Sequence, residues 1–96
     1  MKQSSFEWDE NKDAVNQQKH GVSFEKAQYA FDDLHRVISR DLEHSSDLEE
    51  RFFCFGLVHG KVLTVRFTYR HKRIRIFGAG YWRKGKEHYE QANRLH

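Results

Sequence analysis

The spacing of apolar residues predicts two helices in the first third of the chain. The first is expected from about Asp9, a suitable N-cap, to His20, and Gly21 suits the left-handed conformation that commonly ends a helix. A second helix is expected to begin at Ser23. Its apolar residues recur at helical spacing, as Phe24, Ala27, Phe31 and Leu34. This stripe predicts that the second helix packs against another part of the protein.

From about Arg36 the pattern changes to the alternation that is typical of strands. Four such segments follow one another: RVISRDL, RFFCFGLVH, VLTVRFTY and RIRIFGA. The short connections between the last three suit hairpins, so an antiparallel meander is predicted. Phe52–Val58 is apolar on both faces, which is typical of a strand covered on both sides, although so short a run also fits a buried helix.

The C-terminal part is predicted to contain a loop and a helix. The glycine-punctuated segment GAGYWRKGK, residues 78–86, is interpreted as a loop, and a helix is expected from about Lys86 to Arg94. The predicted architecture is an α+β domain with two N-terminal helices, an antiparallel meander of about four strands and a C-terminal helix. Because the chain has no proline and no Ser/Gly-rich linker, residues 1–96 are expected to form a single domain.

Alternation divides the third strand segment into two faces. One face is apolar and is expected to pack in the core: Leu63, Val65, Phe67 and Tyr69. The other face is hydrophilic and basic: Thr64, Arg66, Thr68 and Arg70. In the next segment Arg75 likewise alternates with Ile74 and Ile76. The arginines of both strands are therefore expected to share one surface of the sheet.

Charge is distributed unevenly along the chain. Residues 1–50 contain six basic and twelve acidic residues (net −6), whereas residues 51–96 contain eleven basic and two acidic residues (net +9). Between Lys61 and Lys86 there are nine Lys or Arg residues and no Asp or Glu. Such a segment is expected to bind a polyanion, and Tyr69, Tyr81 and Trp82 among the cations are candidates for stacking on unpaired bases. The alternative is an ordinary solvated sheet face.

Other patterns in the sequence argue against several kinds of site and location. The single cysteine, Cys54, allows no disulfide, and its apolar neighbours predict a buried, inert thiol. The sequence contains no HExxH motif, no paired-carboxylate motif and no nucleotide-binding glycine motif, so neither a metal site nor a cofactor is predicted. It also lacks an apolar signal segment and any run of about 18 apolar residues, so a cytoplasmic protein without membrane contact is expected.

Metal-free RNA cleavage needs a base for the 2′-hydroxyl, a cation at the phosphate and an acid at the leaving oxygen. Arginines supply the cation. Glu50 is a candidate base, although a Glu beside an Arg is more often a surface ion pair. His88 and Tyr89 are candidate acids. The histidines in predicted loops and at helix ends are interpreted as solvated: His20, His44, His59 and His71.

Four stretches of the sequence resemble the BrnT family of toxins from bacterial type II toxin–antitoxin operons: FEWDENK, KHGVSFEKA, ERFFCFG and RIRIFGAGYWRKGKEHYE. The resemblance runs from Phe6 to Glu90. It implies a RelE-like α+β ribonuclease that blocks translation by cleaving mRNA, free or on the ribosome. It also implies a BrnA-type antitoxin with a ribbon-helix-helix DNA-binding part, and a complex of the two that binds operator DNA and represses its own promoter.

Carried onto this sequence, the resemblance places matching charged positions at Glu50, Arg51, Arg70, Arg73 and Arg75. We predict Glu50 as the base and Arg51, Arg70 and Arg75 as the groups that hold the scissile phosphate. Further RNA contacts are expected from Arg66, Lys72, Arg73, Trp82, Arg83 and Lys84. Two alternatives stay open: a non-catalytic nucleic-acid binder, and an interaction module whose basic face binds an acidic antitoxin segment.

Overall fold

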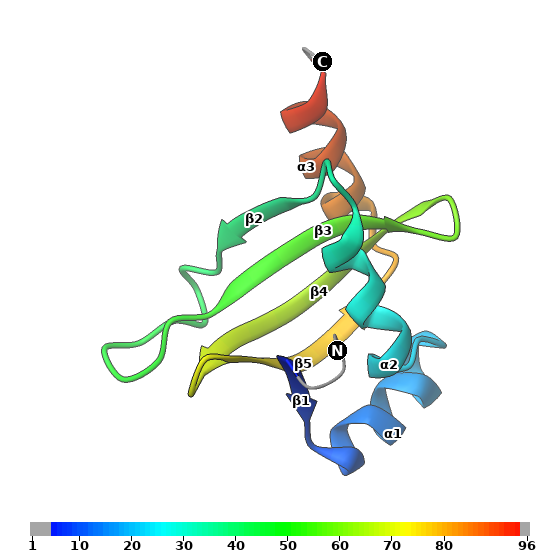
Figure 1. Cartoon of the computed structure of the whole chain (residues 1–96). Helices are drawn as coiled ribbons and strands as arrows, with labels where there is room; N and C mark the ends of the chain where they lie inside the picture. The colour runs from blue at the N-terminus through cyan, green and yellow to red at the C-terminus, as the bar shows by residue number, and fades with distance from the viewer. Residues whose placement is uncertain (1–4, 95–96) are drawn as a thin grey trace.

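A computed structural model of the chain describes residues 5–94, in which five strands form one sheet (Figure 1). The elements in chain order are β1 (Phe6–Trp8), α1 (Glu10–His20), α2 (Phe24–Ala27), the 3₁₀ helix η2 (Gln28–Asp32), β2 (Val37–Arg40), β3 (Phe52–Val58), β4 (Lys61–Arg70), β5 (Arg73–Gly80) and α3 (Arg83–Asn93). The sheet order is β1-β5-β4-β3-β2, and β1 is parallel to β5. The predicted antiparallel meander is present as β2–β5.

Two features of the sheet differ from the sequence-based prediction. Strand β1, which pairs Phe6 with Ile74, was not predicted, because three residues are too few to show alternation. The predicted loop 78–86 is reduced to Tyr81 and Trp82, since β5 continues to Gly80, one residue beyond the predicted strand RIRIFGA, and α3 already begins at Arg83. A Cβ at Gly80 would collide with the ring of Trp82, which packs on it.

The predicted helix ends follow local chemistry. Gly21 adopts the left-handed conformation (φ 68°) and donates its N–H to the Gln17 carbonyl at 2.9 Å, as expected for a helix C-terminus. The Ser23 hydroxyl accepts a hydrogen bond from the Lys26 amide at 3.0 Å. Asp9 occupies the N-cap position, but its side chain makes no capping hydrogen bond.

The second helix is shorter than predicted. The α-helix α2 has only four residues, and η2 continues it as a 3₁₀ helix. Phe24 and Ala27 are fully buried, but Leu34 is 90% exposed and therefore does not belong to the packed stripe. The chain has left helical geometry before Leu34, so the side chain no longer points toward the sheet.

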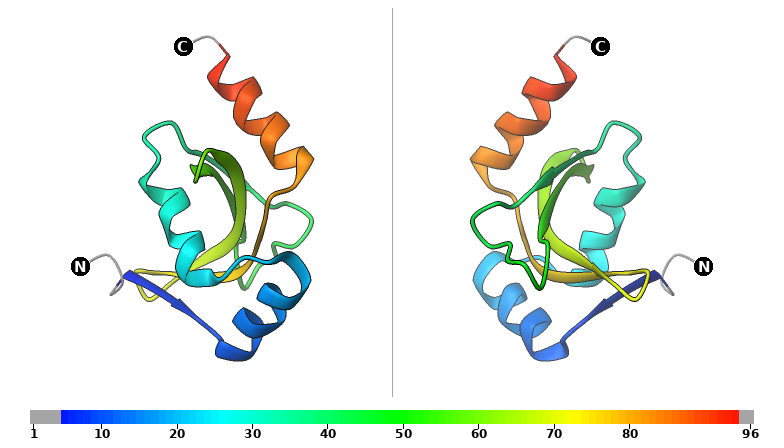
Figure 2. Two further views of the ribbon diagram at one scale, coloured as in Figure 1. Left: turned by 90° about the vertical axis from the view of Figure 1, so that its right-hand side faces the viewer. Right: turned by 90° about the vertical axis from the view of Figure 1, so that its left-hand side faces the viewer.

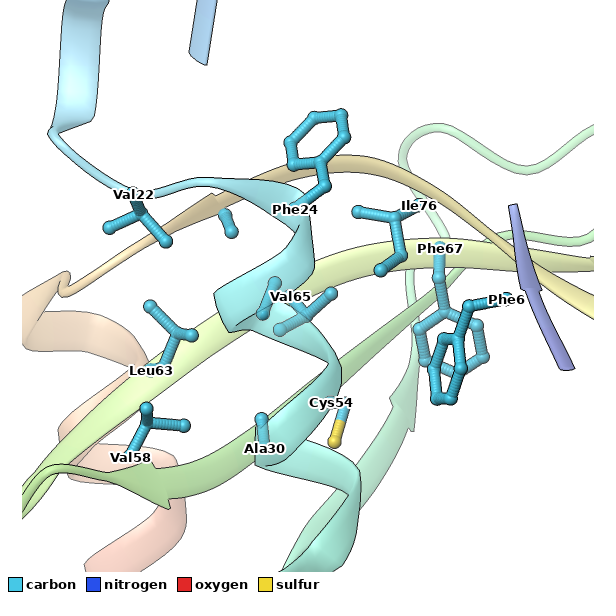
Figure 3. Close-up of a cluster of buried hydrophobic side chains, with 12 residues drawn as sticks. Phe6, Val22, Phe24, Ala30, Cys54, Val58, Leu63, Val65, Phe67 and Ile76 are labelled. Atoms are coloured by element: carbon cyan, nitrogen blue, oxygen red, sulfur yellow. The ribbon is translucent and has the colours of Figure 1, made fainter. Parts of the chain in front are cut away.

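The main core lies between one face of the sheet and the helices α2 and η2 (Figure 3). Fully buried members come from both sides of this interface: Val22, Phe24, Ala30, Cys54, Leu63, Val65, Phe67 and Ile76. Cys54 is fully buried, as predicted, and burial raises the pKa of its thiol to about 12. Tyr69 does not join this core, because at the end of β4 its side chain is 57% exposed.

The other face of the sheet is covered only in part. Helix α3 packs over one end, where Tyr89 meets Phe55 and Val62, and α1 lies beside β5 (Figure 2). Thr64 and Thr68, which were predicted on an open hydrophilic face, are buried. Thr64 lies against Gly85 of α3, and the Thr68 hydroxyl donates to the Glu50 carbonyl at 2.6 Å. The remainder of this face stays open and carries the basic residues.

Candidate nucleic-acid interface

The uncovered part of the second sheet face, called the open face below, is formed by residues that alternate with the core. Phe53 of β3, Arg66 of β4 and Gly78 of β5 are in register across three strands. In the adjacent rows Thr68 pairs with Arg75, and Arg75 pairs with Glu7. Because side chains in one row of a sheet point to the same side, these residues share the open face.

A β-bulge adds an aromatic ring to the open face. Arg66 pairs with Gly78 but the following Phe67 pairs with Ile76, so Phe77 is an extra residue in β5. The Lys12 ammonium lies 5.4 Å and the Arg51 guanidinium 4.2 Å from the centre of the Phe77 ring. The bulge therefore places Phe77 between a cation of α1 and a cation of the segment that precedes β3.

A cavity of about 340 Å³, called the Arg66 cavity below, lies between α1 and the open face. Its charged or titratable lining residues are all basic: Lys12, Lys19, His20 and Arg66. Arg66 forms no hydrogen bond or ion pair with another residue of the described range 5–94. A half-buried guanidinium without a carboxylate partner is thus available to an anion.

Asn16 fixes α1 against β5 and so shapes the Arg66 cavity. The side chain is buried and donates from Nδ2 to the carbonyls of Val22 and Ala79, both at 2.9 Å. Its Oδ1 accepts from the Ala79 amide at 3.2 Å. Three hydrogen bonds from one side chain satisfy its donors and hold the helix in a single register on the strand.

The structure brings Arg51 and Arg70 together, as predicted, but around Glu49. The Glu49 carboxylate accepts from Arg51 Nε and Arg70 Nη2, each at 2.9 Å. The hydrogen bonds from Arg51 and then Arg70 lower the pKa of Glu49. A carboxylate held in this way is a weak base and neutralises part of the charge of both arginines.

Arg75 and Arg73 are tied to a second carboxylate. Arg75 Nη1 lies 3.1 Å and Arg73 Nε 3.5 Å from the carboxylate of Glu7 in β1. Arg73 Nη2 also donates to the Phe6 carbonyl at 2.7 Å. Strand β1, which was not predicted, therefore supplies the carboxylate that pairs with Arg73 and Arg75. These are two of the arginines for which the sequence predicted contacts with the phosphate and with RNA.

Glu50, the predicted base, makes its ion pair with Arg40 at 2.9 Å, and both side chains are more than half exposed. Glu49 and Arg51 are two positions apart and both reach the open face, whereas the intervening Glu50 reaches Arg40. Glu50 lines a further cavity of about 360 Å³ together with Glu49 and Arg70. The prediction placed Glu50 beside Arg51 by adjacency, but in an extended chain neighbours point to opposite sides.

The other predicted residues are spread over three places. Lys72 lies in the turn between β4 and β5, while Arg83 and Lys84 form the first turn of α3. Trp82, the residue before α3, lines the Arg66 cavity and two further cavities. Its ring also contacts His20 edge-on, with 5.1 Å between ring centres.

The two candidate acids on α3 have different surroundings. His88 is exposed, and its ring stacks on Phe55 with 5.2 Å between centres. Tyr89 is buried, and its hydroxyl donates to Asp33 at 2.6 Å. Burial, together with this hydrogen bond, raises the pKa of Tyr89 to about 12, so its proton is held at neutral pH.

Sequence reasoning missed the contribution of α1 to this face. Lys12, Lys19 and His20 line the Arg66 cavity, although they lie more than 40 positions before Arg66 in the chain. The available signal was the KHG run at the end of the first helix, in which His20 was interpreted as a solvated residue. Its position depends on the packing of α1 on β5, which no local pattern reveals.

Within residues 5–94, no three His, Cys, Asp or Glu side chains are grouped closely enough to hold a metal ion. None of the helices in this range is both long and apolar enough to cross a bilayer.

The fold and the open face define a class of protein, a small α+β domain with a basic, aromatic-bearing sheet surface between two helices. Residues 8–86 match the family model described as the ribonuclease toxin BrnT of type II toxin–antitoxin systems. The chain belongs to this family, and the resemblance found in the sequence is confirmed. The match includes α1, the whole meander and the first turn of α3. No curated protein matches the chain.

Proposed function

We propose that this protein cleaves mRNA without a metal ion, blocks translation and is neutralised by a cognate antitoxin. The observation that carries the proposal is the Arg66 cavity, where, among residues 5–94, the guanidinium has no ion-pair partner, stands among further cations and meets no carboxylate in the lining. A phosphodiester placed there meets forked donors that hold its charge in the ground state and its added charge in the pentavalent transition state.

The three arginines that the sequence predicted at the scissile phosphate have a supporting electrostatic role in this proposal. Arg51, Arg70 and Arg75 border the same face, but each is held by Glu49 or Glu7. They raise the local potential and attract the RNA strand, while their carboxylate partners fix their positions. We therefore assign the scissile phosphate to Arg66 and the flanking phosphates to these three arginines.

His20 is the residue that we propose for proton transfer. Its imidazole lines the same cavity as Arg66 and is exposed, so a 2′-hydroxyl or a leaving 5′-oxygen can reach it. A histidine side chain can act as either a general base or a general acid. Glu50, in contrast, is engaged by Arg40 on the surface.

The proposed partner is a BrnA-type antitoxin with a ribbon-helix-helix part, whose complex with the toxin represses the shared promoter. Support comes from family membership, since a type II toxin is paired with a protein antitoxin. The charge of the open face suits an acidic antitoxin segment that occupies the place of RNA. In this arrangement operator DNA is bound through the complex, and the toxin acts in the cytoplasm.

Purified protein incubated with single-stranded RNA in EDTA tests the proposal directly. We expect cleavage that persists in EDTA and is lost in Arg66→Ala, with both proteins unfolding at similar temperatures. RNA that stays intact, free or in translating ribosomes, would contradict the proposal. If RNA is bound with a steep salt dependence but stays intact, the protein is a non-catalytic binder instead.

A further inference from the structure

A second cavity adjoins the Arg66 cavity on the far side of Trp82. It has a volume of about 740 Å³ and lies between the segment that follows β2, the strand β3 and the helix α3. This volume falls within the range of about 300–1,000 Å³ that is typical of small-molecule sites. Trp82 lines both cavities, so the second one continues the surface that the proposed function gives to RNA.

Flat rings form the wall of this second cavity, which we call the aromatic cavity. Phe53 and Phe55 stack with 5.7 Å between ring centres and 20° between planes. The imidazole of His88 stacks on Phe55 at 5.2 Å and 6°. Phe53 is only half-buried and lines the cavity, so part of its ring stays accessible. Parallel rings that line a hollow are the arrangement on which unpaired bases stack.

Opposite charges stand at the rim of the aromatic cavity. Lys84 supplies an exposed ammonium and Glu43 an exposed carboxylate. Neither side chain forms an ion pair or hydrogen bond within residues 5–94. The ammonium can bind a phosphate of the RNA strand. The carboxylate can only accept hydrogen bonds, so its partner must be a donor such as the exocyclic amino group of a base.

We infer that the aromatic cavity is a binding pocket for one unpaired RNA base that carries an exocyclic amino group. The inference rests on the proposed function for the identity of the ligand. The strand crosses Trp82, with one phosphate at Arg66 and the neighbouring base stacked against Phe53. Adenine, cytosine and guanine offer Glu43 an amino group, whereas uracil does not. Base-paired RNA is rejected, because its bases are stacked inside the duplex.

Two variants test this pocket by equilibrium binding of fluorescent single-stranded rA and rU oligonucleotides. Wild-type protein is expected to bind rA more tightly than rU. Glu43→Gln, a change at an exposed residue that keeps one acceptor oxygen but removes the charge, is expected to reduce this preference. Phe53→Leu is expected to weaken binding of rA by about 5- to 150-fold, the range that corresponds to loss of one base–aromatic stack.

Tyr29→Leu is the matched control, because Tyr29 is a 50% exposed aromatic residue of η2 that lines neither cavity. Thermal unfolding of each variant separates a folding defect from a binding defect. Equal affinity of the wild-type protein for rA and rU, or equal effects of Phe53→Leu and Tyr29→Leu, would overturn the inference.

The same measurements distinguish a failure of the proposed pocket from a failure of the proposed function. Base-dependent binding without cleavage would contradict the ribonuclease proposal and leave the pocket standing. Cleavage that is insensitive to both Glu43→Gln and Phe53→Leu would leave the ribonuclease standing and remove the pocket.

Discussion

The hydroxyl of Tyr89 donates a 2.6 Å hydrogen bond to the carboxylate of Asp33. Asp33 follows η2, and its carboxylate also accepts from the backbone amides of Leu57 and His35, at 2.8 and 2.9 Å. Burial acts to raise the pKa of Asp33, but the hydrogen bonds from Tyr89, Leu57 and His35 outweigh it and the pKa is lowered. One carboxylate thus joins α3, the turn after η2 and the strand β3.

Asp33→Asn is expected to destabilise the protein by about 1–3 kcal/mol at neutral pH, because the buried Tyr89 hydroxyl and the amides of Leu57 and His35 lose a charged acceptor. The pKa of Asp33 is lower in the folded state, so its contribution is present above the unfolded pKa and is lost as the pH falls through the folded pKa. Urea unfolding at pH 7, 5 and 3 should therefore show a gap between wild type and variant that narrows with acidification. Asp47→Asn, at an exposed loop residue, is the control.

The hydrogen bond between Tyr89 and Asp33 also predicts a loss of stability at alkaline pH. The pKa of Tyr89 is raised from 10.0 to about 12, so the stability that it contributes is present below pH 10 and is lost as the pH rises toward 12. Tyr89→Phe removes the titrating group, and its unfolding free energy should change less over this interval than that of the wild type. Parallel curves for the two proteins would contradict a structural role for the hydroxyl.

Gly85→Ala is expected to weaken the attachment of α3. A Cβ at Gly85 would collide with the Thr64 hydroxyl and would lie 3.1 Å from Phe55 Cδ1. Overpacking commonly costs about 1–3 kcal/mol, whereas Ala in place of Gly in a helix gains about 1 kcal/mol. We therefore expect net destabilisation in chemical unfolding.

The double variant Gly85→Ala with Thr64→Ala tests the cause of this loss. Removing the hydroxyl should recover part of the stability, because the main collision is gone. A stabilising Gly85→Ala would show that α3 is free to shift and would contradict close packing on Thr64.

Features of the fold that depend on residues close together in the chain were predictable from the sequence. Gly21 ends α1 and Ser23 begins α2 through contacts within four residues, so local patterns suffice. Strand β1 was not predictable, because its pairing with β5 joins Phe6 to Ile74 and nothing in three residues indicates such a partner. Likewise, the extension of β5 to Gly80 was not predictable, because this glycine suggests a loop until the ring of Trp82 is seen to occupy the space above it.

The basic character of the site was predictable, but its arrangement was not. Arg51, Arg70 and Arg75 were selected by type and position, and all three border the open face. Which of them stay free depends on Glu49 and Glu7, and carboxylate pairing is a property of tertiary structure. The cations of α1 reach Arg66 only because Asn16 bonds to Ala79, 63 residues away.

Asn16→Ala should therefore affect both stability and activity. It leaves the amide and the carbonyl of Ala79 without their partner, and a loss of about 2–3 kcal/mol is expected. RNA cleavage by the folded fraction should also fall, because α1 no longer holds its cations over Arg66. Gln18→Ala, at an exposed position of the same helix, should change neither property. Stability loss without any change in cleavage would argue against a contribution of α1 to the site.

Arg66→Ala and Arg75→Ala discriminate the free arginine from a paired one. Loss of Arg66 is expected to lower kcat by about 10²- to 10³-fold, as for a group that stabilises transition-state charge. Loss of Arg75 is expected to cost less than about tenfold and to act on RNA binding, since its guanidinium is shared with Glu7. Arg66→Lys, which keeps the charge but not the fork, should be intermediate. Equal losses in Arg66→Ala and Arg75→Ala would favour the assignment made from the sequence.

His20→Gln is expected to abolish proton transfer while leaving RNA binding intact. A general acid or base contributes about 10²- to 10⁴-fold, so kcat should fall by that factor with little change in the dissociation constant. One limb of the pH–rate profile should also disappear, an effect that a residue with a structural role would not produce. The matched control is His59→Asn in the turn between β3 and β4, because asparagine tolerates the left-handed backbone (φ 55°) found there. Unchanged cleavage in His20→Gln would assign proton transfer to another group and return Glu50 and His88 to consideration.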